Sequence, residues 1–278
     1  MLPALAARPL GDAHLSQVAA ALNTDPVSAC LVAARFEQAG MDRAALGGQF
    51  WGVSGGRDGL CFAGPNLVPL TGDAHAIRLF ATAFGRRGRT CASILGPAAL
   101  VLPLWERLAP RWGAARDIRS DQPLLICPRD PVVPLDQQVR VVRPDEIEAY
   151  YPAAVAMFTE EVGVDPRAGD GGRWYRARVA DLIASGRAFT RFDGDEVVFK
   201  AEIGALSSQV ALIQGVWVHP RRRGQGLSAP GTAAVVDRIR RLYRRLPSLY
   251  VNRDNLPARA TYTRVGFTQV GTFASVQF

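Results

Sequence analysis

The sequence predicts a mixed α/β (α+β) protein. Its C-terminal half would hold a mostly antiparallel sheet flanked by helices, and a second α/β domain would precede it. The main observation is the order of elements in the second half, which is strand, two helices, three antiparallel strands, glycine-rich turn and helix. The first half alternates strands and helices, and a proline-rich stretch separates the halves. A length of 278 residues suits two domains, and 48% hydrophobic with 21% charged residues is typical of a globular chain.

The first half begins with two helices. Asp25 and Pro26 supply the cap and the first-turn proline of the second helix, and Gly40 ends it. Asp73 is expected to cap a later helix, and Pro103 is expected to kink or break the one that follows. In chain order, we expect helices over 13–22 and 26–39, strands over 49–53, 60–63 and 67–70, a helix over 74–84, a strand over 90–95, a helix over 96–107 and a strand over 124–126.

The second half starts after three prolines within 128–138, which favour extended backbone and mark a linker. The predicted domains are therefore 1–127 and 139–278. In the second domain we expect a strand over 139–143, a helix from Pro144 to about Thr159, a loop over 160–166, a helix over 173–185, and strands over 188–192, 196–206, 209–218 and 248–252.

One stretch organises the second domain, from Gln214 to Pro230. A strand ends before Pro220, which has no N–H to give to a ladder, and Gly224 and Gly226 allow a tight turn. A helix then starts at Ser228 and is expected to reach Arg245. A helix N-terminus presents free N–H groups and partial positive charge, so this arrangement favours an anion.

The same stretch resembles a known cofactor loop. Val218-x-Pro220-x-x-Arg223-Gly224-x-Gly226-x-Ser228 is similar to the acyl-CoA pyrophosphate loop of the Gcn5-related N-acetyltransferases (GNAT), although Ser228 stands where Gly or Ala is usual. A P-loop is excluded, because Lys200 is the only lysine and no Gly-Lys-Ser/Thr is present. The segment Asn255-x-x-Ala258-x-x-Thr261-Tyr262-x-x-x-Gly266-Phe267 resembles a second motif of the family, and the resemblance covers 139–278.

The resemblance implies specific roles. Backbone groups of the strand before the loop would bind the pantetheine arm of acetyl-CoA by β-augmentation, and loop amides would hold its pyrophosphate. Tyr262 would be the acid that protonates the leaving thiolate, or else a structural tyrosine beside the cofactor. The implied cofactor-binding residues are Val216, Trp217, Val218, Arg223, Gly224, Gln225, Gly226, Leu227, Ser228, Ala229 and Asn255.

The general base is less determined. Glu202 lies within a predicted strand that faces the reaction centre in the family, but Lys200 shares its face, so a same-face ion pair is the competing interpretation. Glu160 and Glu161 fall in the loop that forms the acceptor site in relatives. For His219 we favour a structural role or a place near phosphate.

The first half repeats the order of elements at 210–278. One interpretation is a tandem, with a first domain of similar fold that lacks the loop, because Thr71-Gly72-Asp73 stands where the second half has Arg-Gly-Gln-Gly. The other is an unrelated α/β domain.

The leading hypothesis is an acetyl-CoA-dependent N-acetyltransferase that transfers the acyl group directly to an amine, on a small molecule or a protein. The alternative is a non-catalytic acyl-CoA-binding regulator. A third reading, nucleic-acid binding through arginines, follows from the net charge of +8, but a basic surface also suits an anionic cofactor. The identity of the acceptor and the oligomeric state do not follow from the sequence.

The cysteine spacing and the length of the apolar runs argue against a bound metal and against a membrane-spanning helix. Cys30, Cys61, Cys91 and Cys127 are too far apart for a zinc motif and are expected to be buried thiols, so we expect no metal. Residues 1–8 lack the order of a signal peptide, and no apolar run approaches the ~20 residues of a spanning helix. The expectation is a cytoplasmic protein.

Overall fold

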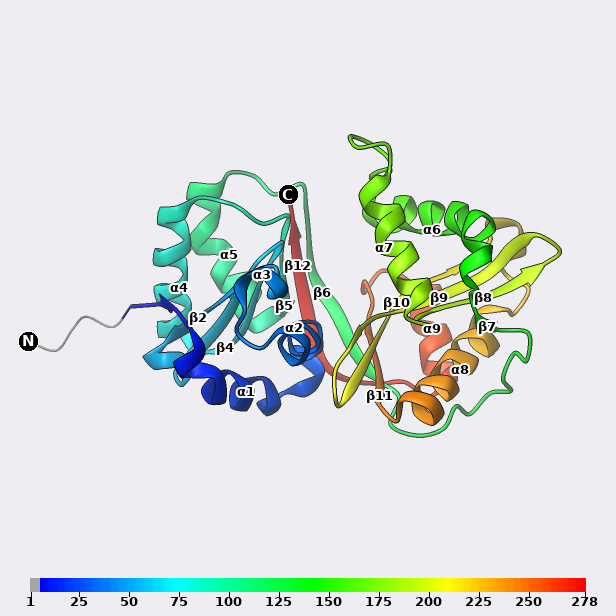
Figure 1. Cartoon of the computed structure of the whole chain (residues 1–278), viewed down its shortest axis with the longest axis horizontal. Coiled ribbons are helices and arrows are strands. Elements are labelled where there is room, and N and C mark those ends of the chain that lie inside the picture. Colours follow the sequence, from blue (N-terminus) through cyan, green and yellow to red (C-terminus); the bar gives the residue numbers. More distant parts are fainter. Residues whose placement is uncertain (1–5) are drawn as a thin grey trace, which may run out of the picture.

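A single twelve-stranded sheet runs through residues 6–278, the range that this computed structural model describes. Its strand order is β1-β2-β3-β4-β5-β12-β6-β11-β10-β9-β8-β7. Figure 1 shows the two halves of the chain side by side, with β6 and β12 lying between them. Residues 1–5, which carry part of the signal-peptide expectation, lie outside the described range.

The first half packs helices on both faces of its strands. Helices α4 and α5 form one apolar core with these strands, and α1 and α2 form another. Asp25 and Asp73 accept hydrogen bonds from the N–H groups of Ser28 and Ala76, so both predicted caps are confirmed. The elements are β1 Arg8–Pro9, α1 Leu15–Thr24, α2 Pro26–Ala39, α3 Arg43–Leu46, β2 Gln49–Val53, β3 Gly59–Ala63, β4 Asn66–Gly72, α4 Ala74–Arg87, β5 Ser93–Pro97, α5 Ala98–Trp112 and β6 Asp117–Ile126.

Two expectations for this half were wrong in detail. Helix α5 continues through Pro103 and Pro110 to Trp112 without ending at either proline. Strand β6 begins at Asp117, well before the predicted start at Leu124. The first residues of β6 alternate between exposed and half-buried, so they lack the apolar run that marks a strand in sequence.

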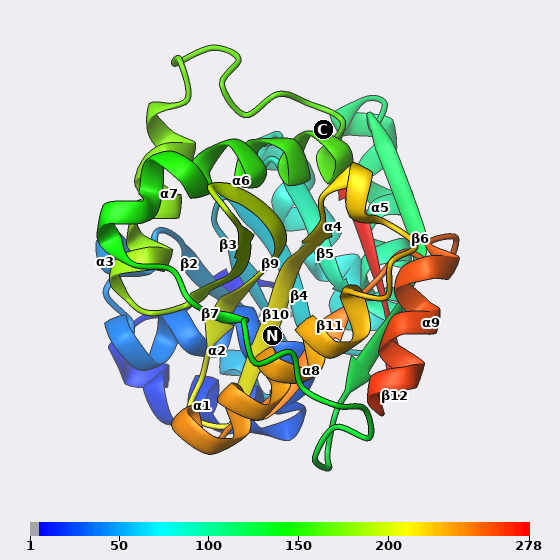
Figure 2. The same ribbon diagram turned by 90° about the vertical axis from the view of Figure 1, so that its right-hand side faces the viewer.

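The second half has the predicted order, with helices on both faces of its strands. Helices α6 and α7 share one apolar core with Val197 and Trp217, whereas α8 and α9 share another with Phe199 and Ala201. Figure 2 looks at this half from the end of the molecule. The elements are β7 Arg140–Val141, α6 Ile147–Val162, α7 Arg173–Ala184, β8 Ala188–Asp193, β9 Glu196–Leu206, β10 Val210–Val218, α8 Ser228–Arg238, β11 Leu246–Tyr250, α9 Leu256–Val265 and β12 Thr268–Gln277, with a π-helical turn over Ile239–Tyr243.

The prediction of a loop starting at residue 160 is wrong, and the difference affects the site. Glu160 and Glu161 lie in the last turn of α6, which ends at Gly163 in the left-handed conformation with φ +76°. The helix therefore carries both carboxylates at fixed positions on its C-terminal end.

The halves are joined by an exchange of strands. Strand β12, from the end of the chain, pairs with β5 of the first half, and β6, from the first half, pairs with β11 of the second. The two exchanged strands also pair with each other from Thr268↔Ile126 to Gln277↔Asp117. Each half thus completes the sheet of the other.

Helix α2 adds a second junction. Cys30 and Ala34 of α2 form a small core with Ala205, Val210 and Leu212 of the second half. All four cysteines are buried and free, which confirms the expectation of core thiols. No helix within 6–278 combines the length and the apolar character needed to cross a membrane.

Candidate functional site

The site begins where two parallel strands separate. Strand β10 pairs with β11 only over Val210–Leu212, so on this side the rest of β10 has no strand partner within 6–278. A register shift against β9 between Gln214 and Trp217, together with Gly215 at φ +58°, bulges β10 at the same place. The backbone of Val216–Val218 is therefore available to bind an extended ligand.

The glycine-rich loop lies at the end of this open strand. Gly224 and Gly226 have φ +77° and +80°, a conformation that favours glycine. Helix α8 starts at Ser228 without a side-chain cap, and no acceptor within 6–278 takes the N–H groups of Gly226, Leu227, Ser228 and Ala229. These open amides at a helix N-terminus are suited to bind an anion, which stays a prediction.

A cleft of 710 Å³ connects the loop to the open strand. Most predicted cofactor-binding residues line it, but Gln225 does not: its side chain donates to the carbonyl of Arg221 instead. His219 accepts the N–H of Arg221 and caps the short helical turn before the loop, a structural role. The predicted residues that line the cleft are Val216, Trp217, Val218, Arg223, Gly224, Gly226, Leu227, Ser228, Ala229, Asn255 and Tyr262.

Glu160 ties the end of α6 to the loop. Its carboxylate accepts from the indole N–H of Trp217 at 3.1 Å and from Nη2 of Arg223 at 2.6 Å. Nε of Arg223 donates to the carbonyl of Val218 at 3.1 Å. The arginine of the family motif is thus held against the cleft by a residue that the sequence had placed in a loop.

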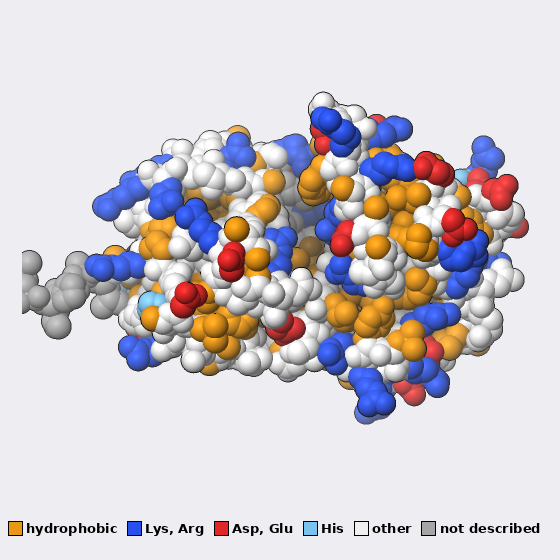
Figure 3. Space-filling model, in the orientation of Figure 1, with side chains coloured by type: hydrophobic (Ala, Val, Ile, Leu, Met, Phe, Trp, Pro, Cys, Tyr) orange, Lys and Arg blue, Asp and Glu red, His pale blue; other side chains and the backbone are white. Residues whose placement is uncertain are grey.

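A second cavity, of 510 Å³, lies between the two halves and meets the cleft. Figure 3 shows the molecule hollowed between its halves. The residues that line both spaces are Met157, Glu161, Val216, Asn255, Ala258 and Tyr262.

Tyr262 lies at this junction. It is buried, and within 6–278 its hydroxyl makes no hydrogen bond. Burial, and after it the charge of Glu161, raises the pKa of Tyr262 above its ordinary value, so the phenol stays protonated at neutral pH. Asn255 caps α9 by accepting the N–H of Ala258 at 3.2 Å.

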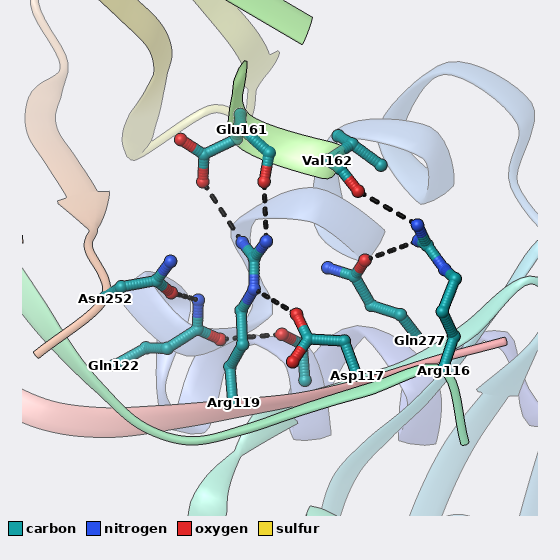
Figure 4. A network of polar contacts seen from close by, with 9 residues as sticks. Arg116, Asp117, Arg119, Gln122, Glu161, Val162, Asn252 and Gln277 are labelled. Atoms are coloured by element: carbon teal, nitrogen blue, oxygen red, sulfur yellow. Dashed lines mark hydrogen bonds and ion pairs between the residues drawn. The ribbon is translucent and has the colours of Figure 1, made fainter. Parts of the chain in front are cut away.

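The exchanged strand β6 supplies one wall of the second cavity. Arg119 donates to the side chain of Glu161 at 3.2 Å and to its carbonyl, and Arg116 donates to the carbonyl of Val162 at 2.9 Å (Figure 4). Gln122 donates to Asn252 at 2.7 Å. No local sequence pattern indicates these residues, because only the strand exchange brings the first half to this site.

Glu202 lies in the wall of the same cavity as part of a buried pair. Its Oε1 is 2.8 Å from Nζ of Lys200 and accepts from the hydroxyl of Tyr150 at 3.1 Å. Burial acts to raise the pKa of Glu202, but the charge and hydrogen bond of Lys200 outweigh it, so the pKa lies below its ordinary value. Burial lowers the pKa of Lys200, against the pull of Glu202. The same-face pair considered from the sequence is confirmed.

The first half has no equivalent loop at its matching helix. Asp73 caps α4 with its own carboxylate, and the hydrogen bond from Ala76 N–H lowers the pKa of Asp73. An acidic cap occupies the position that a phosphate would need. No group of three or more His, Cys, Asp or Glu side chains in the described range is placed to hold a metal ion.

Comparisons with known proteins agree with this geometry. Residues 143–267 match the family model described as "Acetyltransferase (GNAT) family", and residues 48–150 match a "Domain of unknown function (DUF4081)". The comparison with curated proteins gives no significant match.

Solved structures resemble the whole chain at low identity. A GCN5-related N-acetyltransferase from Sphaerobacter thermophilus is 15% identical, with 100% of this chain and 96% of that chain covered and a TM-score of 0.63. An acetyltransferase from the GNAT family of Colwellia psychrerythraea is 12% identical, with 98% and 99% covered and a TM-score of 0.58. A tandem GNAT protein from the clavulanic acid biosynthesis pathway is 18% identical, with 98% of each chain covered and a TM-score of 0.50. The likeness in fold therefore extends over both halves of the chain, and the tandem interpretation stays a prediction.

Proposed function

Because residues 143–267 form a domain of the GNAT acetyltransferase family, we propose that the chain is an acetyl-CoA-dependent N-acetyltransferase that transfers the acyl group directly to an amine. The observation that carries the proposal is the meeting of two cavities at Tyr262, one with the features of a cofactor cleft and one open for an acceptor. Direct transfer needs both substrates at one point, and such a junction provides it.

The residues of the cleft fit acyl-CoA. The open amides from Gly226 to Ala229 would hold the pyrophosphate, and Arg223 would add a full positive charge beside it. The edge of Val216–Val218 that faces away from β9 would bind the pantetheine arm as an added strand. The N–H of Val218 is a candidate donor to the oxyanion that develops on the acyl group.

We assign the acid role to Tyr262. Its phenol is protonated at neutral pH, lies at the junction, and is not committed to another acceptor in the described range, so it is free to protonate a leaving thiolate. No other tyrosine lines both cavities.

The amine must lose a proton, and two carboxylates are candidates to receive it. Glu202 pairs with Lys200 and has a lowered pKa, which makes it a weak proton acceptor. Glu161 lies at the junction of both cavities. We therefore assign to Glu161 the role of accepting the proton from the amine, and to Glu202 a positioning role. Lys200 also donates to the carbonyl of Gly215 at 3.1 Å, so this pair holds the bulge of β10.

The first half would shape the acceptor site. Its strand β6 places Arg119 and Gln122 on the wall of the second cavity, and Arg116, just before the strand, lies on the same wall. Asp73 closes the helix terminus at which the first half would otherwise bind a cofactor of its own.

Two measurements test the proposal. Calorimetry with acetyl-CoA should give saturable binding at one site per chain, and mass spectrometry should detect an acetylated product from a panel of amines. An absence of acetyl-CoA binding would overturn the assignment. Binding without transfer to amino acids, peptides, polyamines or aminoglycosides would favour the non-catalytic acyl-CoA-binding regulator.

A further inference from the structure

Arg178 is a cation of the second cavity that has no hydrogen-bond or ion-pair partner among the described residues. It lies on α7 and lines the cavity between the halves. Its guanidinium makes no hydrogen bond and no ion pair with any residue of 6–278. By contrast, Arg176 on the same helix pairs with Glu148, and Arg119 across the cavity pairs with Glu161. A half-buried guanidinium that faces a cavity without an acceptor is suited to bind an anion there.

A second guanidinium comes from the opposite half. Arg35, on α2, is half-buried over the ring of Phe62 at 5.9 Å and has no carboxylate partner in the described part of the chain. Burial, and after it the positive charge of Arg178, lowers the pKa of Arg35. Two like charges from different elements therefore lie near each other. The carboxylate whose charge Arg178 feels, that of Glu202, is already paired with Lys200, so an anion bound beside Arg178 would relieve the repulsion.

The charged residues of the cavity wall leave a positive surplus. Arg116, Arg119 and Arg178 line it against the carboxylates of Glu161 and Glu202, and Glu202 is already paired with Lys200. The hydrogen-bond partners of Arg116 are neutral oxygens, of Val162 and Gln277. An acceptor whose only charged group is a protonated amine would be repelled by this positively charged wall.

We propose that the acceptor is an amine that also carries a carboxylate, an amino-acid-like molecule, and that Arg178 binds this carboxylate. The inference rests on the proposed acyl transfer and deepens it by naming the acceptor class. The planar fork of a guanidinium matches a carboxylate in two parallel hydrogen bonds. The amine would then reach the junction at Glu161 and Tyr262, which is where the acyl group would be presented.

The body of the acceptor is expected to be apolar. Aromatic side chains line the cavity between its polar groups, and Trp174, which is 64% exposed, stands on the same helix as Arg178. A volume of 510 Å³ is within the range of small-molecule sites. The aromatic lining consists of Phe158, Trp174, Tyr175, Tyr250, Tyr262 and Phe278.

A binding experiment tests this without knowledge of the natural acceptor. The probes are 3-phenylpropionate and its neutral amide, 3-phenylpropanamide, titrated onto the full chain and followed by ligand-observed NMR. We expect saturable binding of the carboxylate and at least about tenfold weaker binding of the amide, as for loss of a charged hydrogen bond. In Arg178→Gln the carboxylate should bind as weakly as the amide.

Three variants serve as controls. Arg178→Lys keeps the charge and should recover part of the affinity. Arg35→Gln removes a nearby positive charge that does not line the cavity, so it should weaken binding of the carboxylate less than Arg178→Gln does. Arg176→Gln, on the same helix but paired with Glu148, should bind like the unchanged protein. The inference would be overturned if the acid and the amide bound equally well or if the acid did not bind. It would also be overturned if Arg178→Gln, in a folded protein, left binding of the acid unchanged. Acetyl-CoA binding, measured separately, decides the proposed function.

Discussion

The ammonium nitrogen of Lys200 lies 2.8 Å from a carboxylate oxygen of Glu202, and neither side chain is appreciably exposed to solvent. The same ammonium group donates to the carbonyl of Gly215, and Gln214 donates to the other oxygen of Glu202 at 3.4 Å. A buried ion pair thus fixes the two residues at which β10 leaves its regular pairing with β9. The pair connects the stability of the core to the geometry of the site.

Removing one partner of this pair should be costly. Lys200→Met leaves the charge of Glu202 buried without a counter-ion, so we expect a loss of about 3–5 kcal/mol in the free energy of unfolding, measured by urea denaturation. The double variant Lys200→Met/Glu202→Gln removes both charges and should recover part of the loss. Equal stabilities of the single and double variants would show that the pair is not coupled.

The pair should also contribute to acid sensitivity. The folded-state pKa of Glu202 is below its unfolded value of about 4.3, so its stabilisation is fully present above that pH and is lost as pH falls through the folded pKa. We expect the stability difference between the unchanged protein and Glu202→Gln to narrow from pH 5 downward in thermal melts. A difference that stays constant to pH 2 would contradict the lowered pKa.

Gly226→Trp should abolish acetyl-CoA binding. A Cβ at this position meets nothing within 4 Å, but the residue has φ +80° and adjoins the open amides, so a bulky side chain would distort and cover the anion site. The matched control is Gly88→Trp, at φ +75° with equally open space at the end of α4, far from the cleft. Calorimetry should give no binding in the first variant and unchanged binding in the second.

Tyr262→Phe should reduce kcat by about 10²- to 10⁴-fold, the range for loss of a general acid. Its hydroxyl makes no hydrogen bond in the described range, so the dissociation constant of acetyl-CoA and the melting temperature should change little. Because burial raises the pKa of Tyr262, its ionisation should not limit activity below about pH 10. Unchanged kcat in Tyr262→Phe would assign it a structural role.

Glu161→Gln and Glu202→Gln separate the two candidate bases. If Glu161 receives the amine proton, its variant should lose about 10²-fold or more in kcat with little change in the dissociation constant of acetyl-CoA. Glu202→Gln should instead lower stability and weaken acetyl-CoA binding through the bulge of β10. The reverse pattern would restore Glu202 as the base.

The two halves should not fold independently. Residues 128–278 alone lack β6, which lies between β11 and β12 in the sheet, so both strands would expose unpaired backbone. We expect this fragment to be insoluble or unfolded by circular dichroism, and co-expression with residues 1–127 to restore a folded complex. A stable, folded fragment would show that the exchanged strands are dispensable.

Local patterns were sufficient for most elements and for the cofactor loop. These features depend on residues close in sequence, so the preferences of residue types for caps, strands and turns were enough to predict them. They are the caps at Asp25 and Asp73, the hairpin strands β8 and β9, and the turn from Val218 to Ser228. The ends of elements were harder, because Pro103 and Pro110 are accommodated inside α5 and Glu161 remains helical up to the glycine that ends α6.

The sequence by itself determined the order of elements, the anion-binding turn and the motif that carries Tyr262, because each is encoded within a few adjacent residues. Only the tertiary structure decided the cavity between the halves. Strand β6 crosses from one half to the other. It brings Arg119 to Glu161 and, just before the strand, Arg116 to Val162, which lie 42 and 46 residues away in the chain. Pairing between distant strands depends on the partner edge and on the buried face rather than on local preference, so no local pattern predicts it.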